Sequence, residues 1–113
     1  MPKRVIPPRP VVRDGLIILG QLVKESRLGR RWTRNELAQR AGISVATIAN
    51  IENGASSTAV GTVFDVADLV GVPIFGIDDR VELARLRRRG EDRLELLPAR
   101  VRHGRQEELS DDF

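Results

Sequence analysis

The sequence predicts an all-α fold made of five short helices. Apolar residues recur at helical spacing in successive segments, and glycines or capping residues stand at the ends of those segments. No two segments show the alternation expected of a pair of strands. At 113 residues, of which 41% are hydrophobic and 31% charged, the chain has the size of one domain with one modest core.

The first helix is predicted from Leu16 to Gly29. Leu16, Leu19 and Val23 recur at the period of an amphipathic helix, and Gly29 is expected to mark its end. The segment 1–14 precedes this helix and opens with MPKRVIPPRP, which has four prolines in ten residues. We therefore expect 1–14 to be a basic, extended arm.

A capping box, TRNE at 33–36, begins the second helix. In this pattern the hydroxyl of Thr33 accepts a hydrogen bond from the Glu36 amide, and the Glu36 side chain reaches back to the start of the helix. Leu37 and Ala38 are expected on the inner face. Gly42 suits the sharp turn with positive φ that ends this helix.

Ser44 is expected to cap a third helix, running from Val45 to about Asn53 and ended by Gly54. Ile48 and Ile51 within it are spaced for burial.

A hydroxyl of the loop 55–58 is expected to cap the fourth helix, which Gly71 ends. Pro73 is predicted as the first residue of a short fifth helix, so that the folded domain spans 15–78. The fourth helix has a broad apolar face formed by Val63, Phe64, Val66, Ala67 and Val70.

Beyond Asp78 the pattern weakens. The arginine-rich extension 79–97 has leucines compatible with a helix, but Gly90 interrupts them and Pro98 ends the segment. Apolar residues are sparse from 98 to 113, so we expect a disordered tail with an acidic end.

Composition excludes several classes of protein. With no cysteine and one histidine, His103, a disulfide framework is excluded and a zinc finger is disfavoured. We expect no metal, no cofactor and no catalytic residues, because no phosphate loop, ligand spacing or nucleophile motif is present. No apolar run approaches the roughly 18 residues of a membrane span and no signal peptide opens the chain. We therefore expect a cytoplasmic protein without membrane contact.

Charge is unevenly distributed along the chain. The net charge is +3, yet basic residues gather in the arm, between Lys24 and Arg40, and between Arg80 and Arg105, while the last eight residues are acidic. Such asymmetry suits a polyanionic partner. A solvated surface without a partner is the alternative for charge runs of this kind.

The string TRNELAQRAGISVATIANIENG, residues 33–54, carries the functional prediction. It resembles the Cro/CI-type, or XRE, family of helix-turn-helix DNA-binding proteins, and the resemblance extends from about Leu16 to Ile77. The matching anchors are Thr33, Leu37-Ala38, Gly42-Ile43-Ser44, Ile48 and Glu52-Asn53-Gly54. This family resemblance implies that the third helix enters the major groove of double-stranded DNA.

The resemblance also implies which residues face the DNA. Asn50 suits bidentate contact with adenine, and valine or alanine side chains pack against thymine methyl groups, so an A·T-leaning half-site follows. Burial of Val45 and Ala46 in the core is the alternative. The positions at which the family presents base contacts are Ser44, Val45, Ala46, Ala49 and Asn50.

Phosphate contacts are expected beside these residues. Arg34 occupies the position where the family usually has a glutamine on a phosphate, and the nearby arginines add positive charge. Trp32 is expected in the core rather than between bases. The complete expected set of phosphate contacts is Arg30, Arg31, Thr33, Arg34, Arg40 and Thr47.

Two kinds of regulator fit these features. The basic arm, the segment GTVFDVADLVGVPIFG and the closing LLPARVRHGRQEELSDDF look like HipB-type antitoxins, which pair with HipA-type serine/threonine kinases. The resemblance implies an antitoxin that represses its own operon as a homodimer on a palindromic operator. We further expect Phe113 to bind the kinase toxin and Arg4 and Arg9 to be candidates for a minor groove. A stand-alone dimeric repressor is the alternative to the antitoxin. A third interpretation is a structural nucleoid protein, which is not a regulator.

Overall fold

The computed structural model describes residues 6–101, which contain five α-helices and confirm the all-α prediction for this part of the chain. The helices divide between two units, Met1–Gly76 and Ile77–Phe113. The first unit holds α1 (Pro10–Gly29), α2 (Arg34–Ala41), α3 (Val45–Glu52) and α4 (Val60–Val70), and the second holds α5 (Arg80–Glu95).

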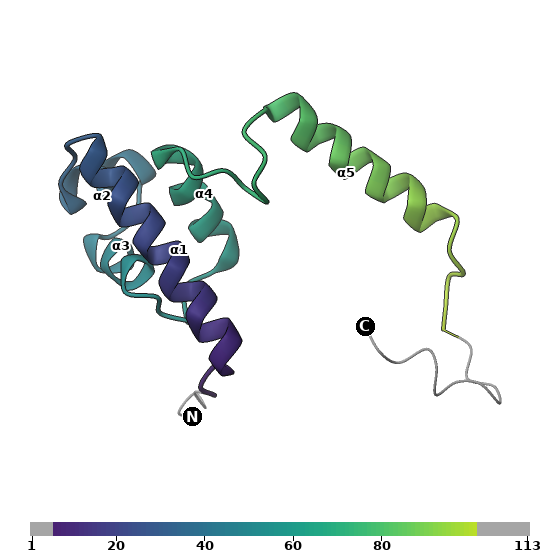
Figure 1. Ribbon diagram of the computed structural model, residues 1–113, viewed down its shortest axis with the longest axis horizontal. Helices are drawn as coiled ribbons and strands as arrows, with labels where there is room; N and C mark the ends of the chain where they lie inside the picture. Colours follow the sequence, from purple (N-terminus) through teal and green to yellow (C-terminus); the bar gives the residue numbers. More distant parts are fainter. Residues whose placement is uncertain (1–5, 102–113) are drawn as a thin grey trace. The chain divides into compact units, whose positions relative to one another are not determined.

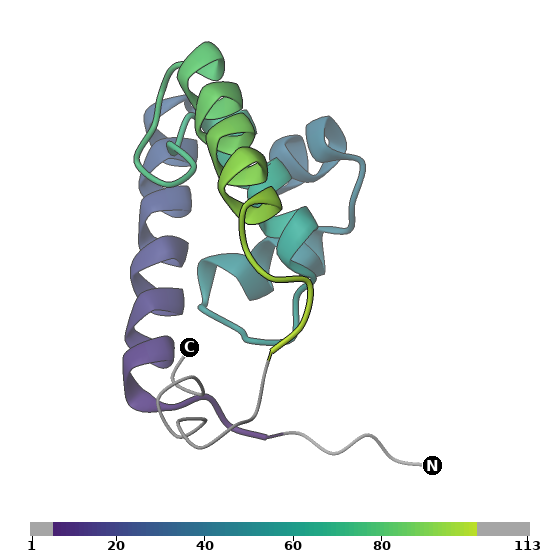
Figure 2. The ribbon, with the colours of Figure 1, turned by 90° about the vertical axis from the view of Figure 1, so that its right-hand side faces the viewer.

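In the first unit α1 lies along one side, α3 and α4 pack against it, and α2 packs against α3 and α4 (Figures 1 and 2). Val23 of α1, Leu37 of α2, Ile48 of α3 and Val66 of α4 are fully buried where these helices meet. One side chain from each helix thus reaches the centre of the core. The predicted burial of Leu37, Ala38, Ile48 and Ile51 is confirmed.

Helix α1 begins six residues earlier than predicted. Pro10 occupies its first turn, where a missing N–H costs nothing. The proline that suggested an extended arm therefore starts the helix. The predicted arm 1–14 is helical from Pro10 onward.

The predicted ends of α2 and the start of α3 are confirmed. Thr33 and Glu36 form the capping box: the Glu36 amide donates to the Thr33 hydroxyl at 3.0 Å, and the Thr33 amide donates to Glu36 Oε1 at 2.9 Å. Gly42 is left-handed with φ of 70°, as the turn requires. Ser44 then caps α3 by accepting from the Thr47 amide at 3.1 Å.

The predicted hydroxyl cap of α4 is wrong. Ala59 is the N-cap residue, and no side chain caps the N-terminus of this helix. Gly71 ends α4 as predicted, with φ of 84°.

The fifth helix is not the one predicted at Pro73. Phe75 and Gly76 both have positive φ, 53° and 70°, which no right-handed helix accommodates. They form a tight turn after Ile74. Instead α5 occupies the arginine-rich extension and runs through Gly90 without a break.

Candidate DNA interface

The segment from α2 to α3 is a helix-turn-helix. Two helices of eight residues each are joined by a turn at Gly42, and they pack against each other. Behind the turn, the Ile43 amide donates to the Ala38 carbonyl at 3.1 Å, which completes the end of α2. The second helix thereby leaves the turn in one defined direction.

Helix α3 is amphipathic, with one buried face and one exposed face. Ile48 and Ile51 face the core, whereas Ser44, Val45, Ala46 and Asn50 are exposed. The alternative that Val45 and Ala46 face the core is therefore wrong. Ala49, the remaining expected base contact, is half-buried.

The hydroxyls at the start of α3 are already engaged. Ser44 Oγ lies 2.8 Å from Thr47 Oγ1 and also accepts from the Thr47 amide. One of the two hydroxyls donates to the other, so the pair keeps one O–H donor and further lone pairs beside the helix N-terminus. Asn50 makes no such internal bond among those found in residues 6–101, although it supplies the carbonyl that accepts from Ala55 at 2.9 Å.

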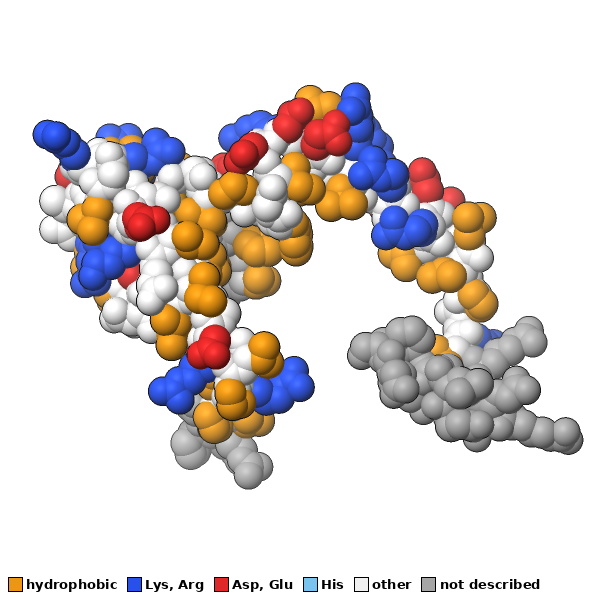
Figure 3. All heavy atoms as spheres, in the orientation of Figure 1, with side chains coloured by type: hydrophobic (Ala, Val, Ile, Leu, Met, Phe, Trp, Pro, Cys, Tyr) orange, Lys and Arg blue, Asp and Glu red, His pale blue; other side chains and the backbone are white. Residues whose placement is uncertain are grey.

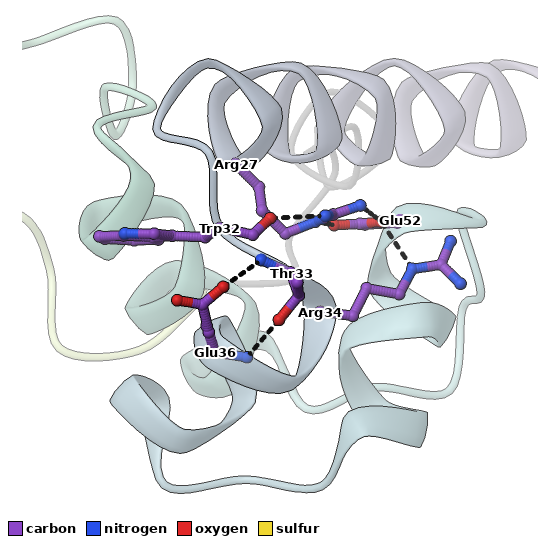
Figure 4. Close-up of polar contacts among 6 residues, drawn as sticks. All are labelled: Arg27, Trp32, Thr33, Arg34, Glu36 and Glu52. Carbon is purple, nitrogen blue, oxygen red and sulfur yellow. Dashed lines mark hydrogen bonds and ion pairs between the residues drawn. The ribbon is translucent and has the colours of Figure 1, made fainter.

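A buried ion-pair network lies beneath this surface (Figure 4). Arg27 of α1 donates from Nε to Glu52 Oε2 at 2.6 Å and from Nη2 to Glu52 Oε1 at 3.1 Å. A third donor, Arg27 Nη1, bonds the Trp32 carbonyl at 2.9 Å. The Glu52 carboxylate is completely inaccessible to solvent. Helix α1, the loop before α2 and the end of α3 are thus joined through one guanidinium group.

Arg34 completes the network from α2. Its Nε donates to Glu52 Oε1 at 3.0 Å, and its side chain is 39% exposed. Burial works to raise the pKa of Glu52, but the hydrogen bonds and charges of Arg27 and Arg34 outweigh it and lower that pKa. One edge of the Arg34 guanidinium therefore orients α3 while the other faces outward.

The remaining expected phosphate contacts have varied surroundings. Arg30 Nε donates to the Val70 carbonyl at 3.0 Å and so satisfies the end of α4. The Arg40 guanidinium carbon lies 4.3 Å from the centroid of the Trp32 ring, and that of Arg30 lies 5.4 Å away. Trp32 itself is half-buried and packs against the core, which agrees with the core interpretation. Arg31 is exposed and Thr33 serves as the cap of α2.

Sequence reasoning missed the two buried charges. Arg27 follows Val23 by four residues and Glu52 follows Ile48 by four, so each extends the buried stripe of its helix. Two opposite charges on buried stripes are the signal that predicts a buried pair. From the sequence, Glu52 is predicted only as an anchor of the family pattern, and Arg27 has no predicted role.

Some expected residues lie outside the described part of the chain. They are Phe113 and Arg4, whereas Arg9 is the N-cap residue of α1. Within residues 6–101 no helix is long and apolar enough to cross a bilayer. Nor do those residues bring together three or more metal-binding side chains.

Comparison with known proteins agrees with this geometry. The helix-turn-helix family model matches residues 23–77. The antitoxin HipB of two Escherichia coli strains is 40% identical to this chain over 48 residues, which is 42% of this chain and 51% or 54% of those proteins. The chain thus spans about half the length of the curated relatives it matches. No solved structure matches it significantly. Residues 23–77, just under half of the chain, are therefore similar to the helix-turn-helix family.

Proposed function

We propose that the protein is a sequence-specific transcriptional regulator that reads DNA with the exposed face of α3 and its N-cap residue Ser44. The observation that carries this proposal is the exposed face formed by Ser44, Val45, Ala46 and Asn50 on a helix whose other face is core. Small exposed side chains let a helix backbone approach the floor of a major groove. The buried contacts of Ile48 and Glu52 hold that helix in one orientation.

Specificity follows from the side chains on that face. Asn50 offers a donor and an acceptor to adenine, whereas Val45 and Ala46 are apolar and suit thymine methyl groups. Ala49 adds a smaller apolar contact because it is half-buried. The preferred half-site is therefore rich in A·T pairs.

Phosphate contacts come from the rim of this face. Arg31, Arg34 and Arg40 are proposed as the main cationic contacts, with Thr33 and Thr47 supplying hydroxyls. The outward edge of Arg34 is suited to a phosphate because Glu52 fixes its Nε. Arg30 takes a smaller share, since its Nε is bonded to Val70.

Selection from a pool of random duplexes tests sequence specificity. We expect an enriched A·T-rich motif, and we expect Asn50→Ala to weaken binding by about 1–3 kcal/mol with relaxed preference at one position. Asn53→Ala is the matched control, because it removes the same amide from the C-cap residue of α3, which is not one of the proposed base contacts. Enrichment of no motif would favour a nucleoid structural protein instead.

Salt dependence tests the phosphate contacts separately. Arg34→Ala should weaken binding to specific and scrambled duplexes alike and reduce the slope of log K against log salt by about one. Lys24→Ala, which removes an equal charge from the exposed side of α1, should leave the slope nearly unchanged. Equal slopes for the wild type and Arg34→Ala would remove Arg34 from the interface.

At the level of biology, we propose a cytoplasmic, HipB-like antitoxin that represses its own operon and neutralises a HipA-like kinase. The support is the 40% identity to HipB over 48 residues. In this proposal a homodimer binds a palindromic operator with half-sites about 34 Å apart, and Phe113 contacts the kinase. Co-expression with a HipA-like kinase tests the pairing: the full chain should co-purify with the kinase, and deletion of residues 106–113 should weaken capture while operator binding persists. Operator binding without any kinase capture would favour a stand-alone repressor.

A further inference from the structure

The three charged side chains that meet at the end of α3 carry one positive charge in excess. Arg27 and Arg34 contribute two positive charges and Glu52 contributes one negative charge. The Arg27 side chain is 7% exposed and that of Glu52 is 0% exposed, whereas that of Arg34 is 39% exposed. The excess charge therefore reaches the surface through Arg34.

Arg27 engages both oxygens of the Glu52 carboxylate. Its Nε donates to Oε2 at 2.6 Å and its Nη2 donates to Oε1 at 3.1 Å, which is the geometry of a bidentate pair. Arg34 donates to the same Oε1 through Nε alone, at 3.0 Å. Arg34 thus meets the carboxylate at one oxygen and with one of its three nitrogens.

This single contact leaves both Nη groups of Arg34 without an internal partner. They donate to no other residue among 6–101, and Figure 4 shows them on the side of the guanidinium that is turned away from Glu52. Two such nitrogens side by side form the fork that binds a phosphate bidentately. Figure 3 shows lysine and arginine side chains at the surface over α2 and the adjoining end of α1, which suits a polyanion.

We propose that the buried Arg27 is a positioning residue for DNA binding, because its hold on Glu52 keeps the Nη fork of Arg34 turned outward. This inference rests on the proposed function, in which Arg34 contacts a phosphate. Without the Arg27 guanidinium, Glu52 is a buried carboxylate with one remaining cation, and Arg34 turns inward to donate to both of its oxygens. The pair of Arg34 and Glu52 is then neutral, and the phosphate loses its cationic partner.

Lysine at position 27 separates charge from geometry. Arg27→Lys retains a positive charge beside Glu52, but one ammonium group lacks the planar fork that holds both oxygens. A second donor of Arg34 then takes the oxygen that is released. We therefore expect Arg27→Lys to weaken binding to the duplex enriched from the random pool by about fivefold or more.

A double-mutant cycle with Arg34→Ala tests whether Arg27 acts through Arg34. In the Arg34→Ala background, Arg27→Lys should weaken binding by less than about twofold, because the contact that it disturbs is already absent. Fluorescence anisotropy measures all four affinities at a temperature at which circular dichroism shows each protein folded. An equal loss in both backgrounds would mean that Arg27 acts on the fold as a whole, and would overturn the proposal. Unchanged affinity of Arg27→Lys would overturn it too, whereas a wild type that enriches no duplex contradicts the proposed function itself.

Substitutions at the surface give a second test that leaves the pair of Arg27 and Glu52 in place. Arg34→Lys keeps the charge but has one nitrogen in place of three, so it cannot bond Glu52 and also present a fork to a phosphate. It should lose about half or more of the log affinity that Arg34→Ala loses. Arg31 provides the matched comparison, because its side chain is exposed and makes no hydrogen bond or ion pair with residues 6–101.

Arg31→Lys should retain most of the affinity that Arg31→Ala loses, since an arginine that no carboxylate holds contributes mainly its charge. Full retention of affinity in Arg34→Lys would overturn the proposal, because charge alone would then suffice at position 34. A loss in Arg31→Lys as large a share as that in Arg34→Lys would overturn it as well, because the requirement for a guanidinium would not depend on Glu52.

Discussion

Arg27 of α1 and Glu52 of α3 form a bidentate ion pair inside the protein, with N–O distances of 2.6 and 3.1 Å. The two residues are 25 positions apart in the sequence. Since the Arg27 side chain is 7% and that of Glu52 0% exposed, neither charge has water as an alternative partner. The C-terminal end of α3 is thereby held against α1.

Removing one partner of this pair should be strongly destabilising. Glu52→Gln should lower the free energy of unfolding by about 3 kcal/mol or more, because Arg27 is left buried without a counter-charge. The double variant Arg27→Met, Glu52→Met should lose less than the sum of the single changes. Urea unfolding of the wild type, Arg27→Met, Glu52→Met and the double variant measures this coupling, and strict additivity would mean that the pair contributes no specific interaction.

Acid should weaken the fold through the same carboxylate. The pKa of Glu52 is lowered from its ordinary value of 4.5, so the stabilisation is complete above that value and is lost as pH falls through the lowered pKa. The pKa of the exposed Glu36 is also lowered, chiefly by the hydrogen bond from the Thr33 backbone. Unfolding free energies measured between pH 7 and 2 should therefore fall on the acid side. Glu52→Gln should flatten that fall more than Glu36→Gln, and the reverse order would contradict the role given to Glu52.

Close packing of α1 on α3 should make Gly20 intolerant of any side chain. Its Cβ would lie 2.6 Å from two carbonyl oxygens that belong to the backbone and cannot easily move. Gly20→Ala should therefore lower the unfolding free energy by about 1–3 kcal/mol. Gly61→Ala is the matched control, since nothing lies within 4 Å of its Cβ position in α4. That change should be neutral or slightly stabilising, and thermal melts of both variants give the comparison.

Arginine at position 31 should be less favourable than glycine, because the backbone there has a positive φ. It has φ of 60° at the end of α1, where the Arg31 amide donates to Leu28 at 2.9 Å and the Trp32 amide to Arg27 at 3.2 Å. Glycine adopts this conformation without the penalty of about 1 kcal/mol that a Cβ brings. Arg31→Gly should thus be more stable than Arg31→Ala by roughly that amount. Both variants lose the same charge, so their DNA affinities should fall equally; unequal affinities would indicate that the loop conformation itself matters for binding.

The sequence by itself determined the parts of the structure that depend on neighbouring residues. The capping box of Thr33 and Glu36, the cap at Ser44 and the left-handed Gly42 are all made within three to five residues. These contacts can be predicted from the sequence because residues that are close in the sequence are also held close in space. For the same reason the exposed and buried faces of α3 follow directly from helical spacing.

Only the tertiary structure decided the contacts between distant segments. The pairing of Arg27 with Glu52, the approach of Gly20 to α3 and the capping of α4 by Arg30 join residues far apart in the chain. Pro73 illustrates the converse, because its preference for a helix start yields to a turn with two residues of positive φ. Local preferences amount to about 1 kcal/mol or less per residue, whereas burial and ion pairing at a helix contact involve several kcal/mol. Where the two conflict, packing prevails, and the partners that packing brings together are not neighbours in the sequence.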